Sequence, residues 1–351
     1  MGFRFPRVRV FPKGKRGWAR CAVTTLAPLA ILAWGTSWVI RMPGQSYTGP
    51  LPPLTDAERV LSDDLRRHVS VLADEIGERN VFLSAKLDRS AAYLEEVLRG
   101  VGFEAGSQWF EVGKHSVRNL EAELPGGEKK NEIVIVGAHY DSVVGTPGAN
   151  DNGSGVAAML ELARLLKDSR PARTIRFVAF VNEEPPFFQT RDMGSFHYAR
   201  RCRKRDENVV AMLSLETIGY YSDEPGSQKY PPLFSFFYPN RGDFIAFVGN
   251  VGSRKLVRRA VESFRKHARF PSEGAAPPGV VPGVGWSDHW SFWRQGFPAL
   301  MVTDTAPFRY PHYHLETDTL DKIDFERLAR VVAGLERVVR DLAGATQPPE
   351  E

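Results

Sequence analysis

Apolar and polar positions divide the chain after Gly102 into two kinds of segment that alternate. Continuous apolar runs, such as "IVIVGA" at 133–138, are typical of strands that are covered on both faces. Such runs predict strands at 117–124, 132–138, 174–181, 209–215, 244–249 and 299–303. Segments with helical spacing predict helices near 153–167, 194–203, 252–267, 287–295 and 324–343. The alternation predicts an α/β fold with a largely parallel sheet between two layers of helices.

Two more helices are expected earlier in the chain. Thr55 can cap a helix that continues to about Ala73, and a second helix is expected from Ser84 or Asp88 to Leu98. A length of 351 residues suits one large α/β domain or two small ones. The predicted division is a basic tail, an apolar segment, a linker, one large domain and a short tail, at 1–20, 21–40, 41–54, 55–345 and 346–351.

Two Pro/Gly-rich stretches interrupt the regular elements. The stretch "MPGQSYTGPLPP" at 42–53 predicts a spacer ahead of the large domain. The stretch at 268–286 is a long loop, which is either a functional rim or a mobile excursion.

Residues 21–40 are uncharged and have about the length that crosses a hydrocarbon core. Seven basic residues precede them, and Trp34 and Trp38 stand where interfacial anchors occur. The segment predicts a single-pass membrane anchor with the N-terminus in the cytoplasm and the large domain outside, periplasmic or extracellular. The alternative is a signal peptide cleaved near Ala33, Trp34 and Gly35, which would release a secreted protein without residues 1–35.

The charge of the chain is unevenly distributed. The formal net charge is +4, but residues 1–41 contribute +8, so the rest of the chain carries −4. No basic face suited to phosphate backbones is expected, and nucleic acid is excluded as a partner. Of the two cysteines, Cys21 lies in the apolar segment, which leaves Cys202 without a disulfide partner outside it. Cys202 is either a reactive thiol among basic residues or an ordinary structural cysteine.

Polar residues follow several of the predicted strands at their carboxyl ends. His139 and Asp141 follow the strand at 132–138, and Glu216 follows the strand at 209–215. Glu183 and Glu184 follow the strand at 174–181. The strand at 299–303 is followed by "PHYHLETDT", which holds His312 and His314. Because ligands of open α/β sheets bind beyond the carboxyl ends of the strands, these side chains are expected to meet at one edge.

Such a group of acids is costly unless cations neutralise it. Imidazole with carboxylates and no thiolate favours a catalytic zinc site. The cluster is dense enough for two metal ions, with Asp151 of the loop "GTPGANDNGSG" as the natural bridge. Asp141 lies on the same side of its strand as His139 and is expected to orient that ring. Glu183 and Glu184 point in different directions, so one can bind metal while the other takes a proton.

The sequence resembles the co-catalytic zinc aminopeptidases, which are bacterial leucyl aminopeptidase-like zinc exopeptidases of clan MH. Their relatives include glutamate carboxypeptidase II and glutaminyl cyclase. The resemblance spans residues 115–343 and rests on six motifs: "GAHYDS", "GANDNGSGVAAMLELAR", "RFVAFVNEE", "MLSLETIGY", "WSDHWSFWRQGFPALMVTDT" and "YHLETDTLDKID". It implies a three-layer sandwich, with a mixed, mostly parallel sheet of about eight strands and helices on both faces. Residues 55–345 would then be a zinc exopeptidase catalytic domain.

The resemblance also implies a ligand set for two zinc ions per chain. His139, Asp151 and Glu216 would hold one ion, and Asp151, Glu184 and His314 the other. Glu183 would be the general base. Many relatives carry aspartate at the position of Glu216, and this departure leaves the affinity and metal identity of the first site open.

Two segments near the motifs have alternative interpretations. The stretch "EEPPFFQTRDMGSFHYA" at 183–199 is longer than the usual turn, and it is either part of the substrate pocket or a surface loop. In the run at 287–289, Ser287 or Asp288 supports the site or caps a helix. His68, His115, His197 and His267 show no pattern of partners and are interpreted as structural or exposed. His312 lies two positions before His314, and the "YH" of the motif favours His314 as the ligand.

The expected function is a membrane-anchored, extracytoplasmic aminopeptidase. It would hydrolyse N-terminal residues from peptides by a water bound to two zinc ions, and it would contact the membrane through its N-terminal helix. A carboxypeptidase or dipeptidase is an alternative that needs a pocket arginine, for which Arg191, Arg241 and Arg309 are candidates. A glutaminyl cyclase and a non-catalytic, receptor-like ectodomain are the remaining alternatives. Aromatic residues in "FFQT", "GYY" and "FSFFY" line an apolar specificity pocket or pack in the core.

Overall fold

The computed structural model describes residues 37–345 and, before them, residues 14, 15, 18, 23, 24, 27 and 35. The chain forms two units, the second of which begins at Met42. Most of the predicted anchor at 21–40, most of the tail at 1–20 and all of the tail at 346–351 lie outside the described residues. Within the described residues, no helix is both long enough and apolar enough to span a membrane. The anchor stays a prediction.

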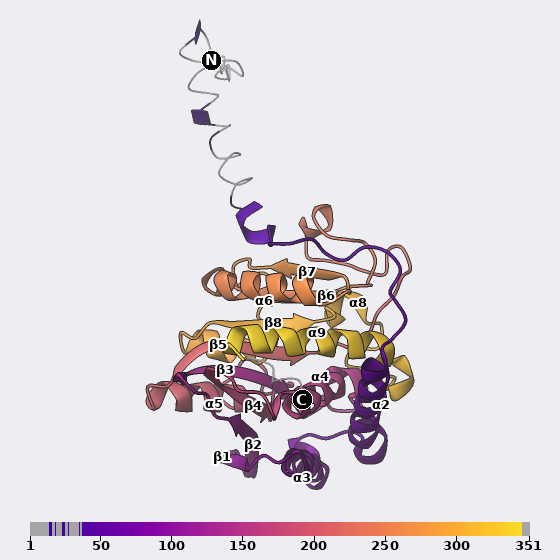
Figure 1. Cartoon of the computed structure of the whole chain (residues 1–351), viewed down its shortest axis with the longest axis vertical. Helices are drawn as coiled ribbons and strands as arrows, with labels where there is room; N and C mark the ends of the chain where they lie inside the picture. The colour runs from indigo at the N-terminus through magenta and orange to yellow at the C-terminus, as the bar shows by residue number, and fades with distance from the viewer. Residues whose placement is uncertain are drawn as a thin grey trace, which may run out of the picture. The chain divides into compact units, whose positions relative to one another are not determined.

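A sheet of eight strands runs through the second unit (Figure 1). In spatial order the strands are β1 (Ala105–Val112), β2 (His115–Leu124), β4 (Arg173–Phe180), β3 (Lys129–His139), β5 (Asn208–Glu216), β8 (Ala299–Thr303), β6 (Ile245–Gly249) and β7 (Ser272–Ala275). The central strands β4, β3, β5 and β8 pair in parallel, as do β6 and β7. The pairs β1–β2, β2–β4 and β6–β8 are antiparallel. The sheet is therefore mixed and mostly parallel, as expected.

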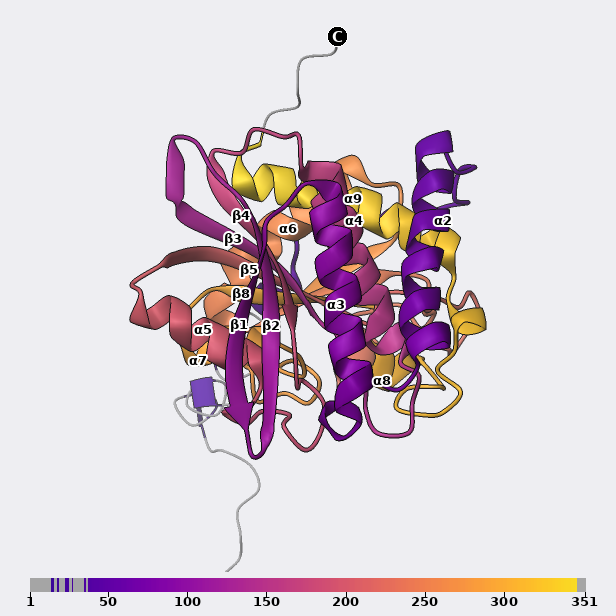
Figure 2. The ribbon, with the colours of Figure 1, turned by 90° about the horizontal axis from the view of Figure 1, so that it is seen from below.

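Helices cover both faces of this sheet (Figure 2). One layer holds α3 (Ser84–Val101), α4 (Gly155–Leu166), α6 (Arg254–His267) and α9 (Phe325–Ala343), and α2 (Asp56–Ser70) packs on α4 and α9. The other layer holds α5 (Gly194–Lys204) and α7 (His289–Arg294). A short helix, α8 (Ala306–Arg309), follows β8. This is the predicted three-layer sandwich.

The alternation of side chains along β3 explains why its sequence is a continuous apolar run. Val134 and Val136 belong to the large core beneath the first helix layer. Ile133 and Ile135 belong to a smaller core with residues of α5 and α7. A strand buried on both faces needs apolar residues at every position.

The predicted strands and long helices are confirmed, but two strands were missed. β1 and β7 are the two edges of the sheet. Most β1 side chains are exposed or half-buried. β7 is a four-residue strand inside the stretch at 268–286, for which the sequence predicts a loop. Neither strand carries the apolar run that marks the central ones.

The stretch at 42–53, predicted as a spacer, makes specific contacts with the domain. The Arg265 guanidinium donates to the carbonyl oxygens of Pro43 and Gly44 at 3.1 and 3.2 Å. The backbone N–H of Ser272 donates to the Ser46 hydroxyl at 2.9 Å. This part of the chain therefore lies against α6 and β7.

Cys202 is buried in the smaller core. Burial raises the pKa of its thiol, which disfavours the reactive thiolate. The interpretation as a structural cysteine is therefore favoured over a reactive one.

Candidate metal centre

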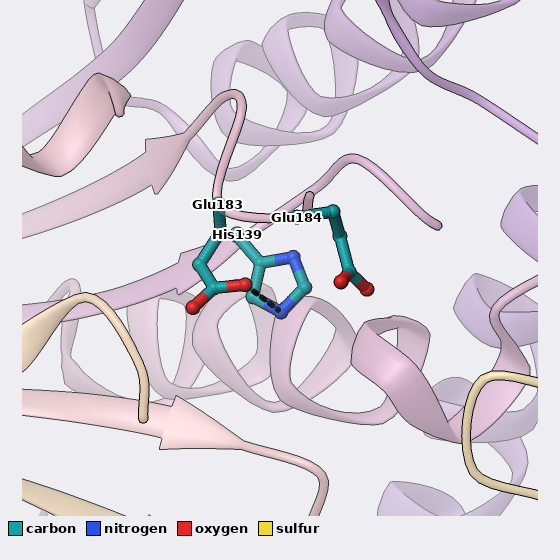
Figure 3. Close-up of side chains that lie close together, drawn as sticks. All are labelled: His139, Glu183 and Glu184. Atoms are coloured by element: carbon teal, nitrogen blue, oxygen red, sulfur yellow. Dashed lines mark ion pairs between the residues drawn. The ribbon is translucent and has the colours of Figure 1, made fainter. Parts of the chain in front are cut away.

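The parallel strands deliver the predicted acids and His139 to one edge of the sheet. His139 is the last residue of β3, Glu216 is the last residue of β5, and Glu183 and Glu184 follow β4. Figure 3 shows the His139 ring between the carboxylates of Glu183 and Glu184. The arrangement follows from topology, since parallel neighbours end on the same side.

A first cluster forms around His139. Its Nε2 atom lies 3.4 Å from Asp151 Oδ1 and 3.3 Å from Glu216 Oε2. The ligand atoms of these three buried residues lie within 4.8 Å of one another, close enough to share one metal ion. Glu216, whose side chain is one methylene longer than the aspartate of many relatives, therefore reaches the cluster.

A second cluster forms around His314 and shares Asp151 with the first. His314 Nε2 lies 3.1 Å from Asp151 Oδ2 and 3.2 Å from Glu184 Oε2. His314 has a φ of 58°, and its ring stacks on Tyr313 with centroids 3.9 Å apart. Asp151 thus offers one carboxylate oxygen to each cluster, which is the geometry of a bridging ligand.

The side chains in both clusters fit metal ions. Four of their buried atoms have no hydrogen-bond partner among the described residues: His139 Nε2, His314 Nε2, Asp151 Oδ2 and Glu184 Oε1. Buried polar atoms are costly without a partner. Burial and the charge of Asp151 also raise the pKa of Glu184 to about 8. Divalent cations would provide the missing partners and offset the repulsion, and nitrogen with oxygen donors suits zinc.

The family membership of the chain follows from a comparison with known proteins. Residues 119–339 match the family described as "Peptidase family M28". The chain belongs to peptidase family M28. The "Uncharacterized protein YfbL" of Escherichia coli is 38% identical over 282 residues, which cover 78% of this chain and 86% of that protein.

The M28 chain is also similar to a second curated protein and to a solved structure. "Probable leucine aminopeptidase 1" of Trichophyton verrucosum is 29% identical, and the match covers 70% of this chain and 66% of that protein. The solved structure of "BSAP, a zinc aminopeptidase from Bacillus subtilis" has a TM-score of 0.65 at 17% identity, covering 83% of this chain and 96% of that one. The structural likeness shows the shared fold, and the M28 membership makes the protein a zinc metallopeptidase.

Asp141 supports the M28 site differently from the sequence-based expectation. Its carbonyl oxygen lies 3.2 Å from His139 Nδ1, whereas its carboxylate oxygen lies 3.6 Å from that atom. The carboxylate instead accepts the backbone N–H groups of Glu183 and Glu184, both at 3.1 Å. The backbone of Asp141 therefore orients the imidazole, and its side chain fixes the two adjacent glutamates.

The loop that carries Asp151 is held by two buried residues that sequence analysis missed. Asp318 accepts the backbone N–H groups of Asn150 and Asp151 at 2.8 and 3.0 Å. The Arg79 guanidinium donates to the carbonyl oxygens of Tyr140 and Gly148, both at 2.8 Å. Asp318 lies in the motif "YHLETDT", which is the one signal that could have singled it out.

Ser287 also supports the site. Its hydroxyl donates to Glu216 Oε2 at 2.7 Å and so fixes one ligand of the first cluster. Asp288 occupies the N-cap position of α7, but its side chain makes no capping hydrogen bond. Of the two interpretations of the run at 287–289, Ser287 therefore fits the one in which it supports the site.

The remaining histidines lie outside the two clusters. His68 Nε2 lies 3.1 Å from Glu161 in a buried contact between α2 and α4, and His312 Nδ1 lies 2.8 Å from the Thr317 hydroxyl. Three more have ordinary surroundings: His115 is an exposed residue of β2, the His197 ring stacks on Phe110, and His267 pairs with Asp341.

An apolar pocket of about 810 Å³, including its open mouth, adjoins the first cluster at Glu216. Its floor is formed by alternate residues of β6 and β8, namely Ala246, Val248, Met301 and Thr303. Two loops, at 230–238 and 276–286, supply ten of its other lining residues. None of its lining residues comes from the insertion at 183–199, but Gln189 of that segment donates to the Gly285 carbonyl of one wall loop at 2.9 Å.

Asp318→Ala removes the acceptor of two amides in the metal loop. We expect zinc affinity to fall about 10–100-fold, because residues that orient metal ligands commonly have effects of this size. Competition with a chelating dye measures the affinity, and circular dichroism checks that the fold is retained. Asp321→Ala, which removes a carboxylate that is 67% exposed, is the matched control. Equal affinities in the two variants would show that the loop does not depend on Asp318.

Proposed function

We propose that this M28 peptidase is an aminopeptidase that removes large apolar residues from the N-termini of peptides with two zinc ions. We further propose that residues 21–40 anchor it in a membrane with the catalytic domain outside. The observation that carries the proposed activity is the apolar pocket beside the candidate metal centre. The anchor is supported by the uncharged length of that segment and the seven basic residues before it.

The charges around the pocket favour a substrate ammonium group over a carboxylate. The charged residues that line the pocket are Glu216 and Glu273, and no arginine or lysine is among its described lining residues. A carboxypeptidase needs a cation for the free carboxylate of its substrate. An N-terminal α-ammonium group needs no such cation, so the described lining of the pocket fits an amine better than a carboxylate.

The arginines considered for a carboxypeptidase do not line this pocket. Arg191 and Arg241 are exposed. Arg309 is buried behind the pocket, where it donates to Gln228 Oε1 at 2.7 Å and to the Phe244 carbonyl at 2.8 Å. The Nε and Nη1 atoms of its guanidinium are thus committed to structural contacts, and Nη2 is buried without a hydrogen-bond partner among the described residues.

The lining of the pocket indicates the side chain that it accepts. Seven aromatic residues share the pocket with small residues: Tyr230, Phe234, Tyr238, Phe244, Trp286, Phe308 and Tyr313. Glu273 faces the Arg265 guanidinium at 3.6 Å, which offsets its charge. An apolar side chain as large as leucine or phenylalanine therefore fits the pocket best.

The proposed roles of the site residues follow from their positions. His139, Asp151 and Glu216 would hold one zinc ion, and Asp151, Glu184 and His314 the other. Zinc at these positions would supply Lewis-acid polarisation of the scissile carbonyl and a lowered pKa for the attacking water. Glu183 lies 4.0 Å from His139 Nε2, and burial raises its pKa well above its usual range, which makes it a stronger base. Glu183 would take the proton of the attacking water and return it to the leaving amine.

The proposed activity is tested with the zinc-loaded chain and paired substrates, free and N-acetylated leucine amides. We expect hydrolysis of the free-amine substrate alone, and we expect a chelator to abolish it. Cleavage of the acetylated substrate would contradict the need for a free amine. Bound zinc without hydrolysis of either substrate would turn attention to the carboxypeptidase and glutaminyl cyclase alternatives.

Glu183→Gln removes the proposed base but keeps the shape of the side chain. We expect kcat to fall about 10²–10⁴-fold, the range for loss of a general base, while zinc content stays the same. Steady-state kinetics and metal analysis measure the two quantities. Glu224→Gln, at an exposed position, is the matched control. Near-normal turnover in Glu183→Gln would remove Glu183 from this role.

Ala246→Phe fills the floor of the pocket. We expect the ratio of kcat/KM for leucine amide to that for alanine amide to fall about 10–100-fold, because burial of a large apolar side chain contributes about 1.5–3 kcal/mol. Ala92→Phe, at an exposed position of α3, is the control. An unchanged ratio would mean that the substrate side chain binds elsewhere.

A further inference from the structure

The point at which the second unit begins is fixed at the β7 edge of its sheet. Met42 packs beside Gly274 of β7, where a Cβ atom added to the glycine would lie 2.9 Å from Met42 Cγ. Arg265 of α6 binds the carbonyl oxygens of Pro43 and Gly44, and Ser272 binds Ser46. Residues 42–46, called the strap here, therefore fix the start of the second unit at β7.

An exposed apolar surface lies on the same strand. The loop at 230–238, called the apolar loop, is attached to β7 because the Tyr238 hydroxyl donates to the Gly274 carbonyl at 2.9 Å. Its inner side lines the pocket, but Leu233, Phe236 and Phe237 point outward and are 68%, 79% and 50% exposed. Exposed large apolar residues grouped in this way mark interaction sites.

The neighbouring helix α6 presents a basic face. Its apolar side packs in the core through residues such as Val261 and Phe264. Its exposed side carries Lys255, Arg259 and Lys266, and Glu262 is the one acidic residue at its exposed positions. Arg269, which is also exposed, follows the helix.

Charge alone does not single out α6. The helix α5 also carries exposed basic residues, including Arg200 and Lys204, but it lies in the opposite helix layer. The β7 edge differs because the strap, the apolar loop and a basic helix meet there. Figure 1 shows β7 and α6 at one end of the catalytic domain, with β1 and α3 at the other.

We propose that the β7 edge, made of the apolar loop and the basic face of α6, docks on an anionic membrane surface. The inference rests on the proposed anchor at 21–40. Aromatic and leucine side chains partition into the interfacial region, and lysine and arginine are attracted to anionic headgroups. The strap keeps this edge within a few residues of the anchor, which raises its local concentration at the bilayer. The docked orientation holds one wall of the substrate pocket against the membrane.

The test uses the full chain in vesicles of phosphatidylcholine with phosphatidylglycerol. An environment-sensitive fluorophore is placed at Phe236→Cys or, as the control, at Phe82→Cys near α3, which is 59% exposed. A Cys21→Ser background leaves the buried Cys202 as the other thiol. We expect brominated lipids to quench the fluorophore at position 236 and not at position 82. Equal quenching at both positions, or none at position 236, would overturn the proposal.

Charge reversal tests the basic face of α6 separately from the apolar loop. The triple variant Lys255→Glu, Arg259→Glu and Lys266→Glu is expected to lower the docked-to-undocked ratio at least about 100-fold in anionic vesicles, since each basic residue is worth about fivefold. The control reverses Arg200 and Lys204 of α5 and Arg205, which follows the helix; all three are also exposed. The same loss in both triple variants would show that only net charge matters and would overturn the role of α6.

Flotation distinguishes failure of the anchor from failure of the β7 edge. Chains that float with the vesicles but show no quenching at position 236 contradict the docking edge and leave the anchor intact. Chains that float only with anionic vesicles, and are released by salt, support the edge and contradict the anchor. A blue shift at position 236 without lipid would mean that a second copy of the chain covers the loop, which contradicts the proposal.

Discussion

One buried carboxylate, that of Asp151, faces two imidazoles with its two oxygens, and the rest of the site depends on this arrangement. Oδ1 faces His139 at 3.4 Å and Oδ2 faces His314 at 3.1 Å. Glu184 and Glu216 stand on either side, and all these carboxylates are buried. Their repulsion opposes the geometry until cations bind, so the fold must hold the ligands in place by other contacts. Those contacts are made largely with the backbone of the loop rather than with the ligand side chains.

The loop that carries Asp151 is fixed from three directions. Asp318 binds its amides, Arg79 binds its carbonyl oxygens, and Asn152 joins it to the end of β5 through the Leu215 carbonyl at 2.8 Å. Gly155 permits that last approach, because a Cβ atom there would lie 2.4 Å from the Leu215 carbonyl oxygen. The backbone of the loop is thereby tied to the strand that supplies Glu216. A change in any of these contacts moves both clusters together, since they share one ligand.

The sequence predicts the centre of the fold better than its edges, and the reason is burial. β3 is apolar at consecutive positions because each face meets a core, and its parallel neighbours place His139, Glu184 and Glu216 at one edge. β1 is largely exposed and β7 contains Gly274, so neither leaves a readable apolar run. No sequence pattern marks Arg79 as a site residue, because its partners are backbone carbonyl oxygens, which any residue supplies. The role of Asp141 was only partly predictable, since strand alternation places it beside His139 but does not say which of its oxygens makes the contact.

Metal binding and substrate recognition occupy different parts of the same sheet. The two clusters sit at the ends of β3 and β5, whereas the pocket lies on β6 and β8. There Phe247 and Val302 face the core, and their neighbours Ala246 and Met301 face the pocket. Gly274 of β7 lines that pocket and also leaves room for Met42, so one residue borders both the substrate space and the start of the domain. The strap therefore borders the wall of the pocket at Gly274 and, through Arg265, at Glu273. The metal ligands lie elsewhere, on β3, on β5 and on loops.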